Sequence, residues 1–263
     1  MAIPLAIRRE LQSIFASFAA SHSRTSVPLA AGKAFEVWLT MKLAEHTRNL
    51  PAWSVSLRDG RDAPLRAGAR YLLRKQRGGI LPASRNSPSF VRISRLRGSA
   101  VFELHGSLQW QGRSNAFHEI DVSMIPFGVA GHFRGTVGGY PSGLPVMAFE
   151  CKDKVSLGPL DEVREKLARM FDLTFLGQAS PPNGYRVFAD AAGTHVGWGG
   201  RSSQYRAHFS NGVFGIARAK GFQSGTKPLA EHYHVRLYGD LYKSGGGLLF
   251  KLLGDFEDCL GRL

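Results

Sequence analysis

The chain has 263 residues, enough for one large domain or two small ones with a sizeable core. Hydrophobic residues make up 43% and charged residues 21%, and no apolar run approaches the ~20 residues of a membrane helix. The composition therefore excludes a membrane-spanning chain and a disordered one. The net charge of +14 favours a polyanionic partner, with nucleic acid ahead of an acidic membrane surface.

The two cysteines indicate the compartment. Cys151 and Cys259 are too few for a disulfide framework and cannot alone complete a zinc site. A reducing, cytoplasmic setting is expected.

The N-terminus has a superficial likeness to a secretory signal. Glu10, Gln12 and Ser13 interrupt any continuous apolar stretch, which argues against a signal peptide. The sequence predicts an amphipathic helix instead, because apolar residues recur at helical spacing. These residues are Ile7, Leu11, Ile14 and Phe18.

Most of the positive charge lies in residues 48–97. This segment holds twelve Lys and Arg residues against two Asp residues, so it carries +10 of the net +14. Eleven of the twelve are arginines, whose planar guanidinium groups bind phosphate oxygens in pairs. The segment favours contact with a nucleic-acid backbone, and a merely solvated basic surface is the alternative. Arg70, Arg74 and Lys154 are the candidate phosphate contacts.

The pattern of apolar residues predicts the elements in chain order. A helix is expected over residues 32–49, and a short helix over 69–76 inside the arginine-rich segment. Three alternating segments separated by turn residues predict an antiparallel meander: residues 90–96, 100–110 and 116–125.

The second half of the chain begins with a Gly- and Pro-rich stretch. Residues 126–145 are expected to form a long surface loop that leads into a fourth strand at 146–152. Helical spacing then predicts a helix over 158–176, and a further strand is expected at 185–190.

The pattern of the last seventy residues predicts secondary structure less clearly. Residues 212–219 favour another strand, 232–242 are ambiguous, and 247–260 predict a terminal helix. Together the elements predict an α/β fold, with a mixed central β-sheet flanked by helices in a single domain over residues 1–263.

Charged residues occupy positions where strands should be apolar. In residues 146–152 the side chains alternate, so Glu150 and Lys152 share one face and Cys151 points to the other. Asp121 likewise interrupts an apolar run. Burying a charge costs several kcal/mol unless it is paired or bound to a metal. Carboxylates on two strands could meet around a hard cation such as Mg²⁺.

These residues resemble a known family. Asp121, then Glu150-Cys151-Lys152 at a strand end followed directly by a helix, with Glu36 in an earlier helix, are similar to the motif of the PD-(D/E)XK nuclease superfamily. The order of elements is also similar to that of its restriction-endonuclease-like fold.

The resemblance covers roughly residues 32–190, which would form the core of the nuclease domain. It departs from the family pattern in two places. Ile120 takes the place of Pro before Asp121, and a long Gly-rich insertion separates Asp121 from Glu150.

The resemblance implies roles for individual residues. Asp121 and Glu150 would hold Mg²⁺ or Mn²⁺, together with the backbone carbonyl of Cys151. Lys152 would orient the attacking water and stabilise charge on the phosphate. Glu36 would complete the outer shell of the metal or the water. A bound metal lowers the pKa of its water and stabilises the leaving oxyanion, so the implied activity is metal-dependent hydrolysis of phosphodiester bonds.

The implied substrate is DNA ahead of RNA, in bacterial restriction or other defence, or in DNA repair. Many such nucleases form homodimers to cut both strands. Two alternatives stay open: a catalytically inactive nucleic-acid-binding module of the same fold, and a structural subunit that binds RNA by charge.

Each candidate residue has a simpler interpretation. Glu150 and Lys152 could be an ordinary ion pair, Asp121 could face solvent, and Glu36 could be an exposed helix residue. Glu119 lies on the face of Asp121 in a regular strand and is a rival metal ligand.

Several other residues are weaker candidates. His232 and His234 have a spacing that a strand could use for a metal, but no third ligand is evident. Trp110, Trp198 and Tyr205 could stack on bases, although each is of a type that more often packs in a core.

Overall fold

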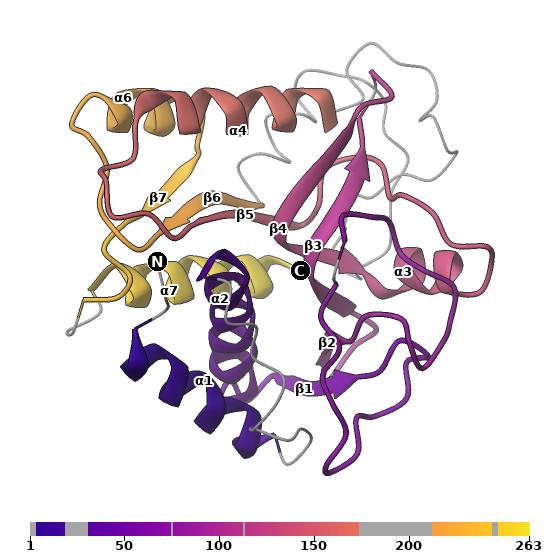
Figure 1. Cartoon of the computed structure of the whole chain (residues 1–263). Helices are drawn as coiled ribbons and strands as arrows, with labels where there is room; N and C mark the ends of the chain where they lie inside the picture. The colour runs from indigo at the N-terminus through magenta and orange to yellow at the C-terminus, as the bar shows by residue number, and fades with distance from the viewer. Residues whose placement is uncertain (1–3, 19–30, 75, 113, 174–211, 244–246) are drawn as a thin grey trace.

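The structure is a computed structural model that describes residues 4–18, 31–74, 76–112, 114–173, 212–243 and 247–263. The described residues form a mixed, open β-sheet and six helices (Figure 1). The strands are β1 (Trp53–Arg58), β2 (Phe90–Arg95), β3 (Val101–Gln111), β4 (Phe117–Pro126), β5 (Met147–Lys152), β6 (Val213–Arg218) and β7 (Arg236–Tyr238). The helices are α1 (Leu5–Ser17), α2 (Ala31–Arg48), α3 (Phe127–Arg134), α4 (Leu160–Leu173), α6 (Thr226–His232) and α7 (Gly247–Arg262).

The strands lie side by side in the order in which they occur along the chain. From β1 to β5 each strand is antiparallel to the next, which confirms the predicted meander and adds β1 to it. From β5 to β7 the strands are parallel, so the sheet is mixed as expected. The strand that pairs with β5 after the α4 crossover is β6, beyond residue 190, where the resemblance was expected to end.

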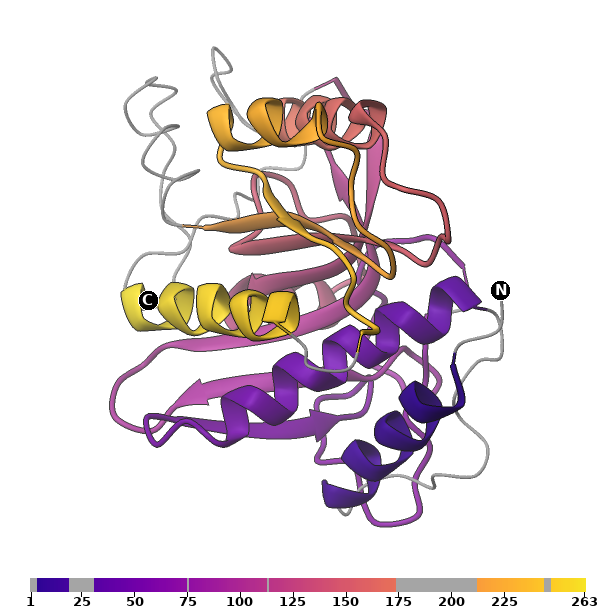
Figure 2. The same ribbon diagram turned by 90° about the vertical axis from the view of Figure 1, so that its left-hand side faces the viewer.

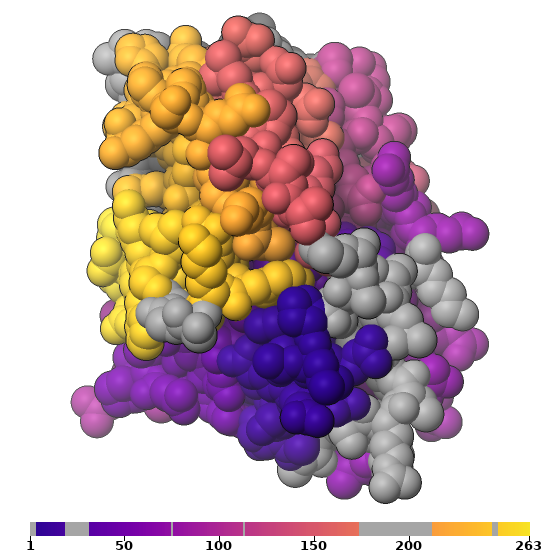
Figure 3. Space-filling view, turned by 60° about the vertical axis from the view of Figure 1, so that its left-hand side comes forward, coloured from indigo at the N-terminus to yellow at the C-terminus, as the bar shows by residue number. Residues whose placement is uncertain are grey.

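Helices cover both faces of the sheet. Helices α1, α2 and α7 pack on one face, and α4 and α6 lie together on the other (Figures 1 and 2). On the face in Figure 3, the N-terminal helix (indigo) lies next to the C-terminal segment (yellow). Among the described helices, none combines the length and the apolar composition that a membrane-spanning segment needs.

Helix α2 lies at the centre of the larger core. Its predicted apolar residues are fully buried, and so are residues on its other sides, because it contacts the sheet, α1 and α7 together. Trp38 donates a hydrogen bond from Nε1 to Glu10 on α1, at 2.7 Å. The polar residues of this nearly buried helix, Lys33 and Glu36 among them, therefore need partners within the protein.

Two expectations are wrong. Residues 126–145 do not form only a loop, because Phe127–Arg134 is helix α3, whose Val129 and Phe133 pack in a core cluster. Residues 69–76 contain no described helix. Leu72 is instead tied to Ser89 through both its N–H and its carbonyl, which holds this segment extended. In both places long-range packing outweighs the local pattern.

The remaining expectations fare differently. The helix expected over 158–176 is α4, and the expected terminal helix is α7. The ambiguous segment 232–242 contains β7. The strand expected at 185–190 lies outside the described residues.

Candidate active site

The pairing of β4 with β5 places Asp121 next to Glu150. The antiparallel ladder pairs Val122 with Phe149, and Asp121 and Glu150 are the next residues beyond that pair. The backbone N–H of Cys151 donates a hydrogen bond to Oδ2 of Asp121, at 2.7 Å. The two strands pair directly in spite of the intervening residues, because those residues fold as α3 and return to the sheet.

The backbone of β3 changes direction at Ser107, which lies beside the site. Ser107 has a φ of 49°, in the left-handed region that non-glycine residues rarely adopt. Before Ser107 in the chain, Phe102 and Leu104 pack in the first core cluster, whereas Leu108, after it, packs in the second. The strained residue therefore marks the point where this strand passes from one core to the other.

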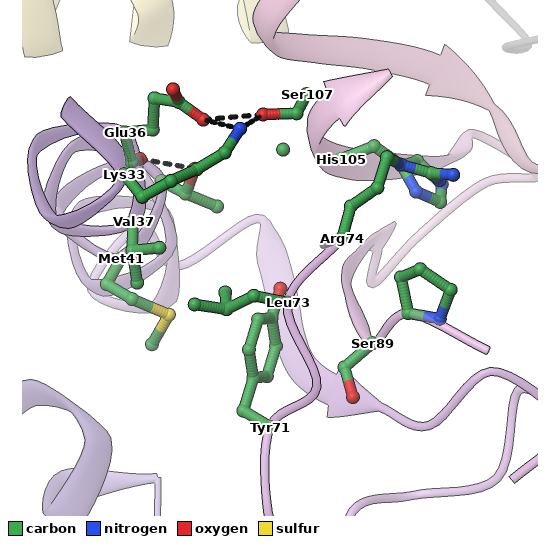
Figure 4. Close-up of a pocket in the computed structure, with 13 residues that line it drawn as sticks. Lys33, Glu36, Val37, Met41, Tyr71, Leu73, Arg74, Ser89, His105 and Ser107 are labelled. Atoms are coloured by element: carbon green, nitrogen blue, oxygen red, sulfur yellow. Dashed lines mark hydrogen bonds and ion pairs between the residues drawn. The ribbon is translucent and has the colours of Figure 1, made fainter. Parts of the chain in front are cut away.

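Glu36 faces the same place from α2. Ser107 donates a hydrogen bond from Oγ to Oε2 of Glu36 at 2.6 Å, and Lys33 Nζ lies 2.9 Å from the same oxygen. Figure 4 shows Lys33, Glu36 and Ser107 pointing toward one another at one end of a pocket, with Met41 and Leu73 at its apolar end. Glu36 is thus a partnered residue facing the sheet, rather than an exposed helix residue.

Glu119, the rival ligand, is engaged by cations. Arg77 Nε lies 2.6 Å from its Oε2, and Lys33 Nζ lies 3.6 Å from its Oε1. Lys33 therefore stands between the carboxylates of Glu36 and Glu119.

Two cations of α4 hold Glu150. Arg169 lies 2.8 Å from Oε2 and Lys166 Nζ lies 3.7 Å from Oε1. The side chains of Glu150 and Lys166 are only 4% and 1% exposed. Burial alone would raise the pKa of Glu150, but Lys166, Arg169 and Lys152 together hold that pKa below its ordinary value. Burial also lowers the pKa of Lys166 in spite of Glu150.

The other two carboxyl groups have the opposite shift. Burial, together with repulsion from Glu150 and Glu36, raises the pKa of Asp121 to about 7. Burial also raises the pKa of Glu36, although its bonds to Ser107 and Lys33 oppose the change. Asp121 and Glu36 therefore lie in a low-dielectric region where positive charge does not offset burial, whereas Lys166 and Arg169 do offset it for Glu150.

Lys152 and Cys151 lie on opposite sides of β5, as alternation predicts. Lys152 is half-buried and close enough to Asp121 and Glu150 to oppose the rise in the pKa of Asp121. Cys151 packs against the first core cluster, and burial raises the pKa of its thiol. The thiol is therefore a packing group and not a nucleophile.

The chemistry of the carboxylates suits a hard divalent cation, since Mg²⁺ prefers carboxylate oxygens. Oε1 of Glu150 is buried and accepts no hydrogen bond in the described part of the chain. Within the described ranges, however, no three His, Cys, Asp or Glu side chains converge closely enough to ligate one ion. The reason is that Glu150 turns toward Lys166 and Arg169, while Asp121 turns toward the Cys151 amide.

The three candidate phosphate contacts differ. Arg70 is exposed, and so is Lys154, which lies 3.5 Å from Glu162. Arg74 is only 8% exposed and donates a hydrogen bond to the Gly79 carbonyl, and burial lowers its pKa to about 10. A phosphate contact at Arg74 stays a prediction, and the burial of its guanidinium against the Gly79 carbonyl argues against a contact at the open surface.

The weaker candidates are resolved in part. Trp110 is fully buried and bonds to Ser123, so it is a core residue and not a stacking platform. His232 and His234 are exposed and belong to no potential metal group among the described residues. Trp198 and Tyr205 lie outside the described residues.

Sequence patterns did not point to four residues of the site: Lys33, Ser107, Lys166 and Arg169. A signal existed for Lys166, because it stands on the apolar stripe of α4 between Val163 and Met170, where a lysine needs a buried partner. No local signal marks Ser107, whose role depends on the backbone of β3.

Comparisons with protein-family models, with curated proteins and with solved structures found no match to this chain. The resemblance to PD-(D/E)XK nucleases rests on the motif residues of the sequence.

Proposed function

We propose that this chain is a metal-dependent nuclease with a restriction-endonuclease-like core, which hydrolyses phosphodiester bonds in DNA. The observation that carries the proposal is the pairing of β4 with β5, which brings Asp121 beside Glu150 and Lys152, with Glu36 of α2 near enough to interact with Asp121 by charge. Such a group of charges in the middle of a sheet destabilises the fold unless the charges are paired or bind a metal, so its presence favours a functional site.

The residues of the site would divide the work as follows. Asp121 and Glu150 would hold Mg²⁺ or Mn²⁺, with the backbone carbonyl of Cys151. When bound, the ion supplies a water of lowered pKa and stabilises negative charge on the phosphate. Lys152 would orient that water and contact the phosphate oxygens, and Glu36 would hold the water shell in place.

Lys166 and Arg169 would support this arrangement from α4. Their positive charge keeps Glu150 ionised, as a carboxylate must be in order to bind a cation. Arg169 contacts Oε2 of Glu150 at 2.8 Å, so an ion that uses this oxygen competes with the guanidinium.

The positive surface supports nucleic acid as the substrate. Seven of the arginines in residues 48–97 are exposed, namely Arg61, Arg66, Arg70, Arg77, Arg85, Arg95 and Arg97. Guanidinium groups bind phosphate oxygens in pairs, and this contact requires no particular base sequence. We propose DNA as the preferred substrate, in restriction, other defence or repair, and a homodimer as the form that cuts both strands.

One observation favours a second function, a nucleic-acid-binding module without catalysis. Glu150 already has two cationic partners, and the described carboxyl groups do not form a ready set of metal ligands. A site that is balanced by its own lysine and arginine could serve only to hold the fold together.

Cleavage assays separate the two functions. The purified protein is incubated with plasmid, single-stranded DNA and RNA, each with Mg²⁺ and with a chelator. We expect Mg²⁺-dependent cleavage that Asp121→Asn and Lys152→Gln each reduce by about 10³-fold, because each removes a group that stabilises the transition state. Glu165→Gln, which changes an exposed carboxylate of α4, is the matched control and should keep full activity. Cleavage that survives the chelator, or that Asp121→Asn leaves unchanged, would contradict the proposal.

A further inference from the structure

The connection between β1 and β2, residues 59–89, contains a groove on the protein surface. The groove has a volume of about 800 Å³ and is open to solvent. Basic and apolar side chains line it, among them Arg61, Arg66, Arg70, Arg85, Leu65 and Leu72. Pockets of this volume that take small ligands are mostly apolar and enclose the ligand, whereas this one is open and rich in arginine, which suits an anionic ligand that extends beyond it.

The backbone that carries the groove is fixed in place. The N–H of Leu65 donates to the Leu57 carbonyl at 2.9 Å, and the N–H of Ser89 donates to the Leu72 carbonyl at 2.8 Å. Gly79 approaches the Gly139 carbonyl so closely that an added Cβ would lie 2.1 Å from it, and only glycine fits there. The arginines therefore stand on a preorganised support, which reduces the entropy lost when a ligand binds.

The groove keeps its positive charge. Asp59 is its one acidic lining residue, and Arg61 lies 2.8 Å from it. Arg66 and Arg85 are exposed and form no ion pair with any described residue. Because no carboxylate offsets these two guanidinium groups, an anionic ligand can bind them without breaking an existing ion pair.

The groove and the candidate active site lie on opposite sides of one extended segment, residues 69–74. Arg70 and Leu72 line the groove, whereas Tyr71, Leu73 and Arg74 line the pocket beside Glu36 (Figure 4). From Arg70 to Leu73 the side chains alternate between the two, as on an extended backbone. A strand in the groove is therefore near the carboxylates but separated from them by the segment.

We propose that this groove is an accessory site that holds single-stranded nucleic acid beside the cleavage site. The basic residues suit phosphates, and Leu65 and Leu72 offer apolar contact to the faces of bases, which a duplex keeps stacked inside. Guanidinium groups can also stack on bases. That the held strand is the substrate rests on the proposed nuclease function, whereas the binding itself does not.

The test is binding of a labelled oligothymidylate of about 12 nucleotides, a length within known single-strand site sizes. Fluorescence anisotropy is measured in chelator over a range of salt concentrations, so that no cleavage contributes. Arg66→Gln with Arg85→Gln should weaken binding about 10-fold and reduce the slope of log affinity against log salt by about 1.4.

The matched control is Arg9→Gln with Arg236→Gln, which removes the same charge from exposed positions outside both the groove and the arginine-rich segment. Binding should change less than about 2-fold, since only long-range charge is lost. An equal loss in both double variants would overturn the inference, as would equally tight binding of a duplex or equal competition by polyglutamate.

The two proposals fail in distinguishable ways. Normal cleavage with no effect of the groove variants on binding would overturn the accessory site alone. A clear groove effect in a protein that cleaves nothing would overturn the nuclease function alone.

Discussion

The carboxylate cluster and the arginine-rich connection, residues 59–89, carry opposite charge and are built in opposite ways. Glu36, Asp121 and Glu150 stand on a helix and two paired strands, so backbone geometry fixes where each side chain lies. The arginines stand on irregular backbone, and neighbouring residues differ in their surroundings. Arg70 is exposed at the groove, whereas Arg74, four residues later, is buried. The net charge of the arginine-rich connection therefore indicates only the class of partner. The positions of the three carboxylates on a helix and two strands indicate where a site lies.

The two regions also differ in how strongly their charges interact. Glu150 and Lys166 are almost completely buried, where a charge interacts strongly with its neighbours. Exposed arginines are screened by water and salt, so each contributes little to stability. Changes in the cluster should therefore alter folding, and changes in the connection should alter binding.

The largest loss of stability is expected for Lys166→Met. This change leaves Glu150 buried with less positive charge around it and should lower the free energy of unfolding by about 3 kcal/mol at pH 7. Urea unfolding measures the effect. The double variant Glu150→Gln with Lys166→Met should recover most of the loss, because position 150 no longer carries a buried charge and Arg169, which is 33% exposed, can be solvated. A loss for Lys166→Met below about 0.5 kcal/mol would show that the pair is not buried as described.

Asp121→Asn should change stability in a pH-dependent way. The pKa of Asp121 is raised from 3.8 to about 7, so the fold favours its neutral form. The contribution of this group is fully present below about pH 4 and is lost as the pH rises through 7. The Asn variant, always neutral, should nearly equal the wild type near pH 4 and exceed it by about 4 kcal/mol at pH 8. Thermal or urea unfolding at both pH values checks this, and a pH-independent difference would contradict it.

A smaller effect should separate two arginines of the connection. Arg70→Gln should reduce the salt slope of nucleic-acid binding by about 0.7 to 0.9, as for one lost phosphate contact. Arg74→Gln should leave that slope unchanged, because the Arg74 guanidinium is buried against Gly79. Binding isotherms at several salt concentrations measure both, and equal slopes for the two variants would remove Arg70 from the interface.

Regular periodicity explains which parts of the molecule could be predicted. The meander from β2 to β4, strand β5, α2 and α7 follow from alternation or helical spacing, as does the opposite orientation of Glu150 and Cys151. Strand β1 is short and lies within the arginine-rich segment, and it was not expected. Helix α3 contains two glycines and forms because its apolar side chains reach the second core.

Long-range contacts explain what could not be predicted. The left-handed Ser107 and its bonds to Glu36 and Lys33 depend on α2 lying across β3, which no local pattern records. The burial of Arg74 depends on the approach of Gly79 to Gly139. Lys166 could have been recognised from the stripe of α4, whereas its partner Glu150 could be known only from the fold.

Metal binding tests the central claim most directly. Mn²⁺ is titrated calorimetrically into the wild type, Asp121→Asn and the control Glu165→Gln above pH 7, where Asp121 is ionised. The account predicts a saturable site in the wild type and in Glu165→Gln, weakened at least about 10-fold in Asp121→Asn. Equal binding by all three proteins, or no binding by the wild type, would contradict the assignment of Asp121 and Glu150 as the metal ligands of a nuclease.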